Sequence, residues 1–416
     1  MSEAVAVEEN INDIPLDQIA PGDPTRFQQD TIFPMFARVR KEDPVHYTAE
    51  SPWGAYWSIT KFEDIIAIDK DHENFSSETG GIVLGDPEED FDIPNFISMD
   101  PPKHDEQRKT VTGIVAPRNL AEMETLIRGR VQTILDSLPI GEEFNWVDKV
   151  SIELTTQMLA TLFDFPFEDR YKLTFWSDMA TATPQVGDTN VTKEERETAL
   201  LECLEYFTRL FNERKAKPPG ETLDLITMLA HGESTKDMDP MEFLGNLVLL
   251  IVGGNDTTRN SISGGVLALN QNPDEYQKLR DNPALIPSMV SEIIRWQTPL
   301  TYMRRTAVND VEFRGKQIKA GDRVIMWYVS GNRDDTVIEK ADQFIIDRAN
   351  PRHHLSFGFG IHRCMGNRLA EMQLRILWEE ILERFEKVEL IGKETRNLSN
   401  FVRGITDLPV VLHAKK

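Results

Sequence analysis

One of the two cysteines lies in a glycine-rich stretch whose residue types could carry out chemistry. The segment 354–373 reads HLSFGFGIHRCMGNRLAEMQ, and around Cys364 it places Phe357, Gly360, His362 and Gly366. The glycines allow positive φ and let the loop approach another group closely. Cys364 stands near the start of a predicted helix, whose free N–H groups favour a negative charge and therefore a thiolate. Such a thiolate is a candidate metal ligand or nucleophile.

Cys364 has several alternative interpretations. A free cysteine is most often a small buried hydrophobic residue, and this is our interpretation of Cys203, the other cysteine. A zinc site needs three or four protein ligands, and the sequence offers no second Cys/His pair at zinc spacing. The segment also lacks the local signature of a cysteine protease. A single thiolate is sufficient to bind a haem iron.

A second group of candidates lies inside the longest helix that the sequence predicts. The run GGNDTT contains Gly253, Gly254, Asp256 and Thr257, and it follows the apolar run LVLLIV, which we expect to be buried all round. Each glycine costs about 1 kcal/mol relative to alanine in a helix. The pair therefore indicates either close helix packing or a bulky, flat group against the backbone. A threonine hydroxyl can bond to the carbonyl four residues earlier, which would form a polar notch suited to proton delivery.

Two further pairs have helical spacing. Glu292 and Arg295 are three residues apart on one helix face, where they can form an ion pair. His104 and Arg108 are four residues apart and could clamp a carboxylate, which arginine binds in a fork geometry. Each pair alone would also fit an ordinary surface helix.

The elements that must position these residues are mostly helices. Apolar residues at three- and four-residue spacing predict helices over 121–138, 150–162, 196–214, 223–231, 240–270 and 368–385. Short strands are expected at 45–47, 55–59, 311–313, 317–319 and 323–328, and breaks at 166–170, 184–190 and 218–220. We predict a mainly α fold with small β-sheets, one domain over residues 1–416 and a flexible tail over residues 1–20.

The composition limits the class of protein. A chain of 416 residues with 40% hydrophobic and 28% charged residues is typical of globular proteins. Two cysteines, no apolar run long enough to span a membrane and no signal-peptide pattern predict a soluble, cytoplasmic protein. The net charge of −23 disfavours binding to nucleic acid or anionic lipid. Two local basic groups could dock an acidic partner: Arg363, Arg368 and Arg375, and Lys103, Arg108 and Lys109.

Together, these motifs resemble those of the cytochromes P450, the haem-thiolate monooxygenases, over nearly the whole chain. The Gly-x-Asp-Thr-Thr element, the Glu-x-x-Arg pair and the Phe-to-Gly cysteine loop occur in the family's order and spacing. The resemblance implies a cytochrome P450 fold with haem b between the long central helix and the cysteine loop. It also implies insertion of one oxygen atom from O2 into an unactivated C–H bond.

The resemblance further implies a role for each motif residue. Cys364 would be the axial ligand of the haem iron, and Asp256 and Thr257 would deliver protons during oxygen activation. Gly253, which replaces the family's usual alanine, and Gly254 would leave room for oxygen. The other implied cofactor-binding residues are Phe357, Gly360 and Gly366 in the loop, and His104, Arg108, Arg305, His354 and His362 toward the haem propionates. Glu292, Arg295 and Arg333 would brace the haem-binding core.

Within the family, the segments GGNDTTRNS and HRCMGNRLAEMQ resemble the bacterial branch that hydroxylates alkanes and fatty acids at the terminal (ω) carbon. This implies an apolar substrate pocket formed by Ile82, Val83, Leu84, Leu249, Val252, Leu300, Thr301, Met303 and Phe401. It also implies a monomer that receives electrons from NAD(P)H through a ferredoxin reductase and a 2Fe–2S ferredoxin.

Three alternatives stay open for the function. The same chemistry could act on a terpene or steroid, because an apolar pocket would suit these substrates as well. A haem-thiolate sensor or electron carrier without turnover is disfavoured by Asp256 and Thr257, since a sensor needs no proton relay. A peroxide-driven enzyme often lacks this acid–alcohol pair.

Overall fold

The structure is a computed structural model that describes residues 10–87, 90–182, 191–218 and 224–415. The breaks predicted at 184–190 and 219–220 lie outside the described residues, as do residues 1–9 of the predicted tail. The rest of the tail that the sequence predicts to be flexible, residues 10–20, contacts the folded protein. Ile19 is 2% exposed, and its carbonyl lies 2.9 Å from His46 Nε2. Apolar side chains in this segment pack onto the N-terminal core and hold it in place.

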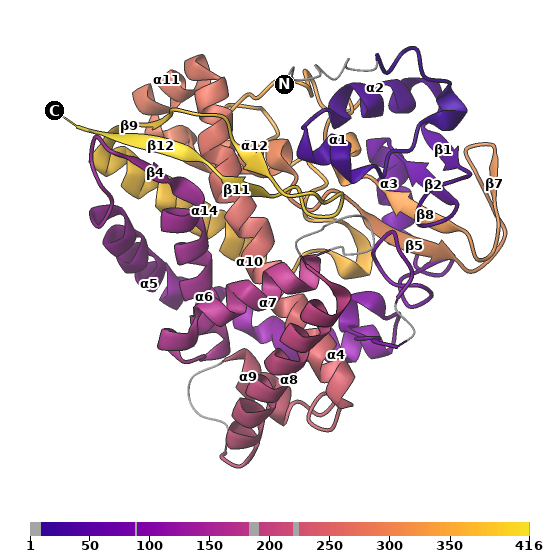
Figure 1. The fold of residues 1–416 in the computed structure, drawn as a ribbon, viewed down its shortest axis with the longest axis horizontal. Coiled ribbons are helices and arrows are strands. Elements are labelled where there is room, and N and C mark those ends of the chain that lie inside the picture. Colours follow the sequence, from indigo (N-terminus) through magenta and orange to yellow (C-terminus); the bar gives the residue numbers. More distant parts are fainter. Residues whose placement is uncertain (1–9, 88–89, 183–190, 219–223, 416) are drawn as a thin grey trace, which may run out of the picture.

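Helices make up most of the fold (Figure 1). They are α1 (Pro24–Gln28), α2 (Ile32–Glu42), α3 (Phe62–Lys70), α4 (Lys103–Thr112), α5 (Pro117–Asp136), α6 (Glu153–Phe163), α7 (Tyr171–Thr181), α8 (Lys193–Lys215), α9 (Leu225–His231), α10 (Pro240–Gln271), α11 (Pro273–Asp281), α12 (Ile286–Gln297), α13 (Tyr328–Gly331) and α14 (Asn367–Arg384). The six predicted helices are confirmed, with ends displaced by a few residues. The one expected at 150–162 begins as a π-helical turn, Val147–Ile152, before α6.

The strands form small sheets, as predicted. They are β1 (Val45–Thr48), β2 (Tyr56–Ile59), β3 (Phe75–Ser76), β4 (Glu143–Asn145), β5 (Met303–Ala307), β6 (Val311–Phe313), β7 (Lys316–Ile318), β8 (Arg323–Met326), β9 (Phe385–Leu390), β10 (Thr395–Arg396), β11 (Ile405–Asp407) and β12 (Pro409–Ala414). The largest sheet has the order β1-β2-β8-β5-β3 and lies with α1–α3 to one side of the helical bundle (Figure 1). The strand expected at 323–328 ends earlier, because Tyr328 begins α13.

The long helix α10 runs through the helical part of the molecule, between α6, α7 and α12. Its start is fixed by Pro240 at the first helical position and by Asp239, whose side chain accepts from the Met241 N–H at 2.8 Å. The apolar run at 247–252 is not buried all round, in contrast to our expectation. Leu249 and Val252 remain partly exposed, so one face of this central helix borders open space.

Candidate active site

Backbone hydrogen bonds and glycines shape the loop before Cys364. The N–H of Cys364 donates to the carbonyl of Phe357 at 2.8 Å. Gly358 and Gly360 have φ values of 63° and 64°, in the left-handed region that favours glycine. A Cβ at Gly360 would lie 2.2 Å from the backbone carbonyl oxygen of Asp69. Glycine is therefore required at position 360, since the end of α3 packs directly against the loop backbone.

Cys364 is accessible although its surroundings enclose it. The residue is exposed, yet burial raises the pKa of its thiol, so the side chain faces a space inside the protein. This pKa is lowered by the N–H groups of Gly366 and Asn367 and by the charges of Arg108 and Arg363. The N–H groups favour a thiolate, as the sequence predicts, but burial outweighs them. A bound cation would be needed to stabilise the thiolate in this position.

The two glycines of α10 face different surroundings. No heavy atom of the described residues outside the local backbone lies within 4 Å of a Cβ built on Gly253, and Gly253 is exposed in the middle of the helix. A Cβ on Gly254 would instead meet Leu159 Cδ2 at 2.7 Å. Gly253 thus borders open space, whereas Gly254 allows α6 and α10 to pack closely. The role of Gly254 in making room for oxygen stays a prediction; the structure shows that a side chain at this position would collide with Leu159.

Thr257 and Asp256 are adjacent but face different groups. The Thr257 hydroxyl donates to the Gly253 carbonyl at 3.0 Å, which is the bond to the fourth preceding residue that the sequence predicts. The Asp256 carboxylate is fully buried; it accepts from Ser177 of α7 at 3.0 Å and pairs with Arg259. Burial raises the pKa of Asp256, while the Arg259 charge lowers it. A carboxyl with a raised pKa is suited to taking up and releasing a proton.

Two histidines meet beside the cysteine loop with unused ring nitrogens. The ring centroids of His104 and His362 are 4.4 Å apart, and His362 Nε2 lies 3.0 Å from Ser77 Oγ. Nε2 of His104 and Nδ1 of His362 are buried without a hydrogen-bond partner in the described part of the chain. Burial lowers the pKa of His362 to about 2 and also lowers that of His104. Both rings are therefore neutral at physiological pH. His104 Nδ1 donates to Asp105 at 2.7 Å, so its free Nε2 is an acceptor, whereas the free Nδ1 of His362 can donate to a ligand when Nε2 accepts from Ser77.

Two arginines complete this group. Arg305 donates to Asp69 at 2.8 Å, Arg108 donates to the carbonyl of Arg363, and the charges of Arg305 and Arg108 both act on His362. The structure thus brings together four of the five residues predicted to face the haem propionates.

His354, the fifth predicted residue, lies elsewhere. Its ring is buried, with its centroid 5.3 Å from that of Phe357, and its Nδ1 accepts from the Ser356 N–H at 3.3 Å. The charge that acts most strongly on His354 is Arg295 of α12. We therefore correct the prediction: His354 supports the cysteine loop from the side of α12 and does not join the cluster of His104 and His362.

Comparison with known proteins identifies the family. The family described as Cytochrome P450 matches residues 59–406. The chain belongs to the cytochrome P450 family. A cytochrome P450-153 structure from Novosphingobium aromaticivorans is 47% identical, with a TM-score of 0.87, over 94% of this chain and 99% of that chain. Linalool 8-monooxygenase from Pseudomonas putida is 36% identical over 404 residues, which are 94% of this chain and 98% of the relative. The methyl-branched lipid omega-hydroxylase of Mycobacterium bovis is 31% identical over 392 residues, 90% of each chain.

The site fits the haem that membership of the cytochrome P450 family implies. Cys364 presents a sulfur to an enclosed space, as an axial ligand must. A Cβ at Gly253 or Gly366 would meet no heavy atom of the described residues within 4 Å, which leaves room for a flat ligand. The unpartnered Nδ1 of His362 can donate to a carboxylate group at the edge of that ligand, and His104 Nε2 can do so once its ring takes up a proton, because His104 Nδ1 already donates to Asp105.

The cytochrome P450 core is braced by Glu292 and Arg295 as predicted, but with a different third residue. Arg295 donates to both carboxylate oxygens of Glu292, at 2.7 and 2.8 Å, and Arg348 donates to the same carboxylate at 2.9 Å. Arg333, which we expected here, lies against the ring of Trp296, 3.4 Å from its centroid. We call Glu292, Arg295 and Arg348 the Glu292 brace.

The predicted substrate residues divide into two groups. Seven keep partial or full exposure: Ile82, Val83, Leu249, Val252, Leu300, Met303 and Phe401. Leu84 and Thr301 are only 1% and 0% exposed. The Leu84 side chain packs in the N-terminal core, and the Thr301 hydroxyl donates to the carbonyl of Asn400. These two residues therefore face packed protein, and the prediction that they line a pocket does not hold.

Sequence reasoning missed several residues that hold the site. Arg259 could have been found, because its spacing of three from Asp256 places both on one helix face. Asp69 carried no signal: it accepts from the Phe359 N–H at 2.7 Å and from Arg305 at 2.8 Å, across more than two hundred residues. Only the packing of α3 against the loop reveals this role.

No helix within the described ranges has the length and apolarity needed to cross a membrane.

Proposed function

We propose that this cytochrome P450 monooxygenase oxidises the terminal carbon of medium-chain alkanes or fatty acids. The single observation that carries the haem-thiolate chemistry is the open face of α10, where Gly253 and Thr257 border space, together with the exposed Cys364; the terminal position is supported by the similarity to an omega-hydroxylase. When bound, the haem supplies oxygen activation and C–H oxidation, and a thiolate ligand favours cleavage of the O–O bond.

The chain's own residues hold the cofactor and move protons. The N–H groups of Gly366 and Asn367 and the charge of Arg108 stabilise negative charge on the Cys364 sulfur. The unpartnered Nδ1 of His362 would donate to the carboxylate edge of the haem, and His104 would add a second donor, Nε2, once that carboxylate favours its protonated form.

Two adjacent residues of α10, Asp256 and Thr257, would deliver protons. Asp256 holds a proton more readily than an ordinary aspartate because it is buried. It can exchange that proton through the Ser177 hydroxyl, while Arg259 stays charged and stabilises the ionised carboxylate. The Thr257 hydroxyl donates its proton to the Gly253 carbonyl, so its oxygen is left to accept a hydrogen bond on the open face of the helix. Apolar neighbours such as Leu249 and Val252 exclude water from the same face.

Substrate binding rests on apolar contact. Leu249 and Val252 of α10, Leu300, Met303 and Phe401 offer apolar surface that burial could use, at about 0.8 kcal/mol per CH2 group. A linear chain suits such a surface because it needs no polar partner along its length. The similarity to a methyl-branched lipid omega-hydroxylase supports oxidation at a chain end.

A terpene is the second candidate substrate. It is favoured by the similarity to linalool 8-monooxygenase over nearly the whole of both chains. A haem-thiolate sensor is disfavoured, because the buried Asp256 and its network would have no purpose without proton transfer.

Electron supply is proposed to come from NAD(P)H through a ferredoxin reductase and a 2Fe–2S ferredoxin. Arg363, Arg368 and Lys109 are exposed near the cysteine loop and α4 and could attract an acidic protein. Two other members of the predicted basic groups contribute less. Arg375 pairs with Glu124 and Glu379, and Lys103 pairs with Glu242.

The test is product analysis after turnover of the haem-loaded protein with a surrogate ferredoxin system and NADH. We expect 1-dodecanol from dodecane, or 12-hydroxydodecanoic acid from dodecanoic acid, and neither product from the Cys364→Ser control. Subterminal alcohols, or oxidation of linalool with no product from either linear chain, would contradict the proposed regioselectivity or substrate class.

A further inference from the structure

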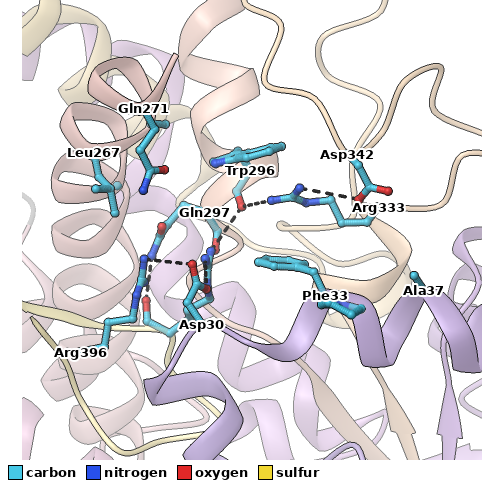
Figure 2. Close-up of a pocket in the computed structure, with 14 residues that line it drawn as sticks. Asp30, Phe33, Ala37, Leu267, Gln271, Trp296, Gln297, Arg333, Asp342 and Arg396 are labelled. Atoms are coloured by element: carbon cyan, nitrogen blue, oxygen red, sulfur yellow. Dashed lines mark hydrogen bonds and ion pairs between the residues drawn. The ribbon is translucent and has the colours of Figure 1, made fainter. Parts of the chain in front are cut away.

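A cavity of about 420 Å³ lies between α2, the C-terminal part of α10, the end of α12 and the segment 396–403 (Figure 2). Its lining includes apolar surface from Phe33, Leu267 and Trp296. Its charged members are Asp30, Asp342, Arg333, Arg396 and Arg403. None of these residues takes part in the site described above.

Arginines outnumber carboxylates in the lining of this cavity. Three arginines face two aspartates, and Glu394, outside the lining, pairs with Arg396 at 3.1 Å. Asp30 is shared, at 2.6 Å from Arg403 and 3.6 Å from Arg396. Arg333 approaches the 65% exposed Asp342 only to 3.8 Å. A buried cation without a close counter-ion is costly, so a further anion would stabilise this arrangement.

Arginine donors in the lining lack acceptors. The Arg396 side chain is 4% exposed, and its Nε and Nη1 have no hydrogen-bond partner among the residues that the structure describes. The same is true of Arg403 Nε. Buried polar groups are normally satisfied, and guanidinium donors are best matched by a carboxylate, which accepts through two oxygens.

The opposite wall offers apolar contact. The guanidinium of Arg333 lies 3.4 Å from the ring centroid of Trp296 and 4.2 Å from that of Phe33. Figure 2 shows Arg333 between these two rings, while Arg396 reaches toward Asp30 on the other side of the cavity. Stacking uses the faces of a guanidinium and leaves its in-plane N–H groups for an acceptor.

We propose that this cavity binds a small organic anion, with its carboxylate held by the unpartnered donors of Arg396 and Arg403 and its apolar body against Phe33 and Leu267. A neutral ligand would leave the arginine donors unmatched. An inorganic anion would not use the apolar wall. The proposal does not depend on which compound the enzyme oxidises.

The test is calorimetric titration of the haem-loaded full-length protein with benzoate, with its neutral analogue benzamide and with inorganic phosphate. We expect saturable binding of benzoate and at least about tenfold weaker binding of benzamide and phosphate, because a hydrogen bond to a charged group is worth that much. Absorption spectra recorded in the same titration should show no change of the Soret band, which separates this site from the haem pocket.

Substitutions locate the binding. Arg396→Gln should weaken benzoate binding at least about tenfold, whereas the same charge change at the exposed Arg118, Arg118→Gln, should leave it unchanged. Asp30→Asn should tighten binding, because Arg396 and Arg403 lose a competing carboxylate; asparagine tolerates the φ of 58° at this position. Equal binding of benzoate and benzamide, phosphate binding as tight as benzoate, an unaltered affinity in Arg396→Gln or no tightening in Asp30→Asn would each overturn the proposal. Failure of the dodecane experiment would leave these results unaffected.

Discussion

Arg348 and Arg333 are two arginines, with side chains 9% and 5% exposed, that the structure uses in opposite ways. Arg348 belongs to the Glu292 brace, where it donates to Glu292 at 2.9 Å and to the carbonyls of Lys340 and Gln343. Arg333 lines the cavity of Figure 2, where its carboxylate partner is 3.8 Å away. Arg348 in the Glu292 brace therefore contacts its counter-ion, whereas Arg333 in the cavity has no carboxylate within hydrogen-bond distance in the described part of the chain.

The difference shows how the same residue type can brace a fold or receive a ligand. In the brace, Glu292 accepts from Arg295, Arg348 and the Ile345 N–H. All five N–H donors of Arg295 have acceptors. A saturated network of this kind has no capacity for a ligand. The cavity and the cysteine loop both keep unpartnered buried nitrogens, and these are the two places where we propose binding.

The largest expected effect comes from breaking the brace. Glu292→Gln removes the charge that two buried arginines share, so we expect the free energy of unfolding to fall by about 3–5 kcal/mol. The matched control is Glu122→Gln, which breaks the exposed ion pair with Arg118 and should change stability by no more than about 0.5 kcal/mol. Urea unfolding followed by circular dichroism measures both. A loss of less than 1 kcal/mol in Glu292→Gln would contradict the bracing role.

A smaller effect distinguishes the two arginines directly. Arg348→Gln should cost about 1–3 kcal/mol, because Glu292 and several carbonyls lose a charged donor. Arg333→Gln should be neutral to within about 1 kcal/mol, since the lost stacking is offset by removal of a poorly paired charge. The same urea experiment provides the comparison. A greater loss in Arg333→Gln than in Arg348→Gln would reverse the assignment.

A third prediction concerns the dependence of stability on pH. Burial, followed by the charge of Arg295, lowers the pKa of His354 from 6.5 to about 3. Between these values the unfolded chain binds one more proton than the folded chain, so stability falls as pH drops below 6.5, by about 1.4 kcal/mol per pH unit. His354→Gln should reduce the slope of unfolding free energy against pH by that amount between about pH 4.5 and 6. An unchanged slope would show that His354 is protonated in the folded protein.

Features that depend on neighbours in the sequence could be predicted. The long helix followed from its proline start and apolar spacing, the cysteine loop from its glycines, and the Thr257 bond to Gly253 from the helical geometry itself. The same holds for the pairing of Glu292 with Arg295, which share a helix face.

Features that depend on packing between distant segments could not be predicted from the sequence. Arg333 and Arg348 are equally plausible partners in sequence, and only the packing of 339–348 against α12 brings Arg348 to Glu292. His354 is close in sequence to Phe357 and the cysteine loop, which suggested a role beside the haem. In the folded chain it lies instead near the charge of Arg295. Leu84 and Thr301 have side chains that could line a substrate pocket. In the structure, however, the Leu84 N–H donates to the Tyr302 hydroxyl and the Thr301 hydroxyl donates to the Asn400 carbonyl, and both residues are buried.

The central claim, that Cys364 binds haem iron as a thiolate, is tested most directly by the absorption spectrum of the reduced, haem-loaded protein under carbon monoxide. We predict the red-shifted Soret band of thiolate ligation, and its loss in Cys364→Ser. A Soret band typical of histidine ligation in the folded wild-type protein would contradict the account.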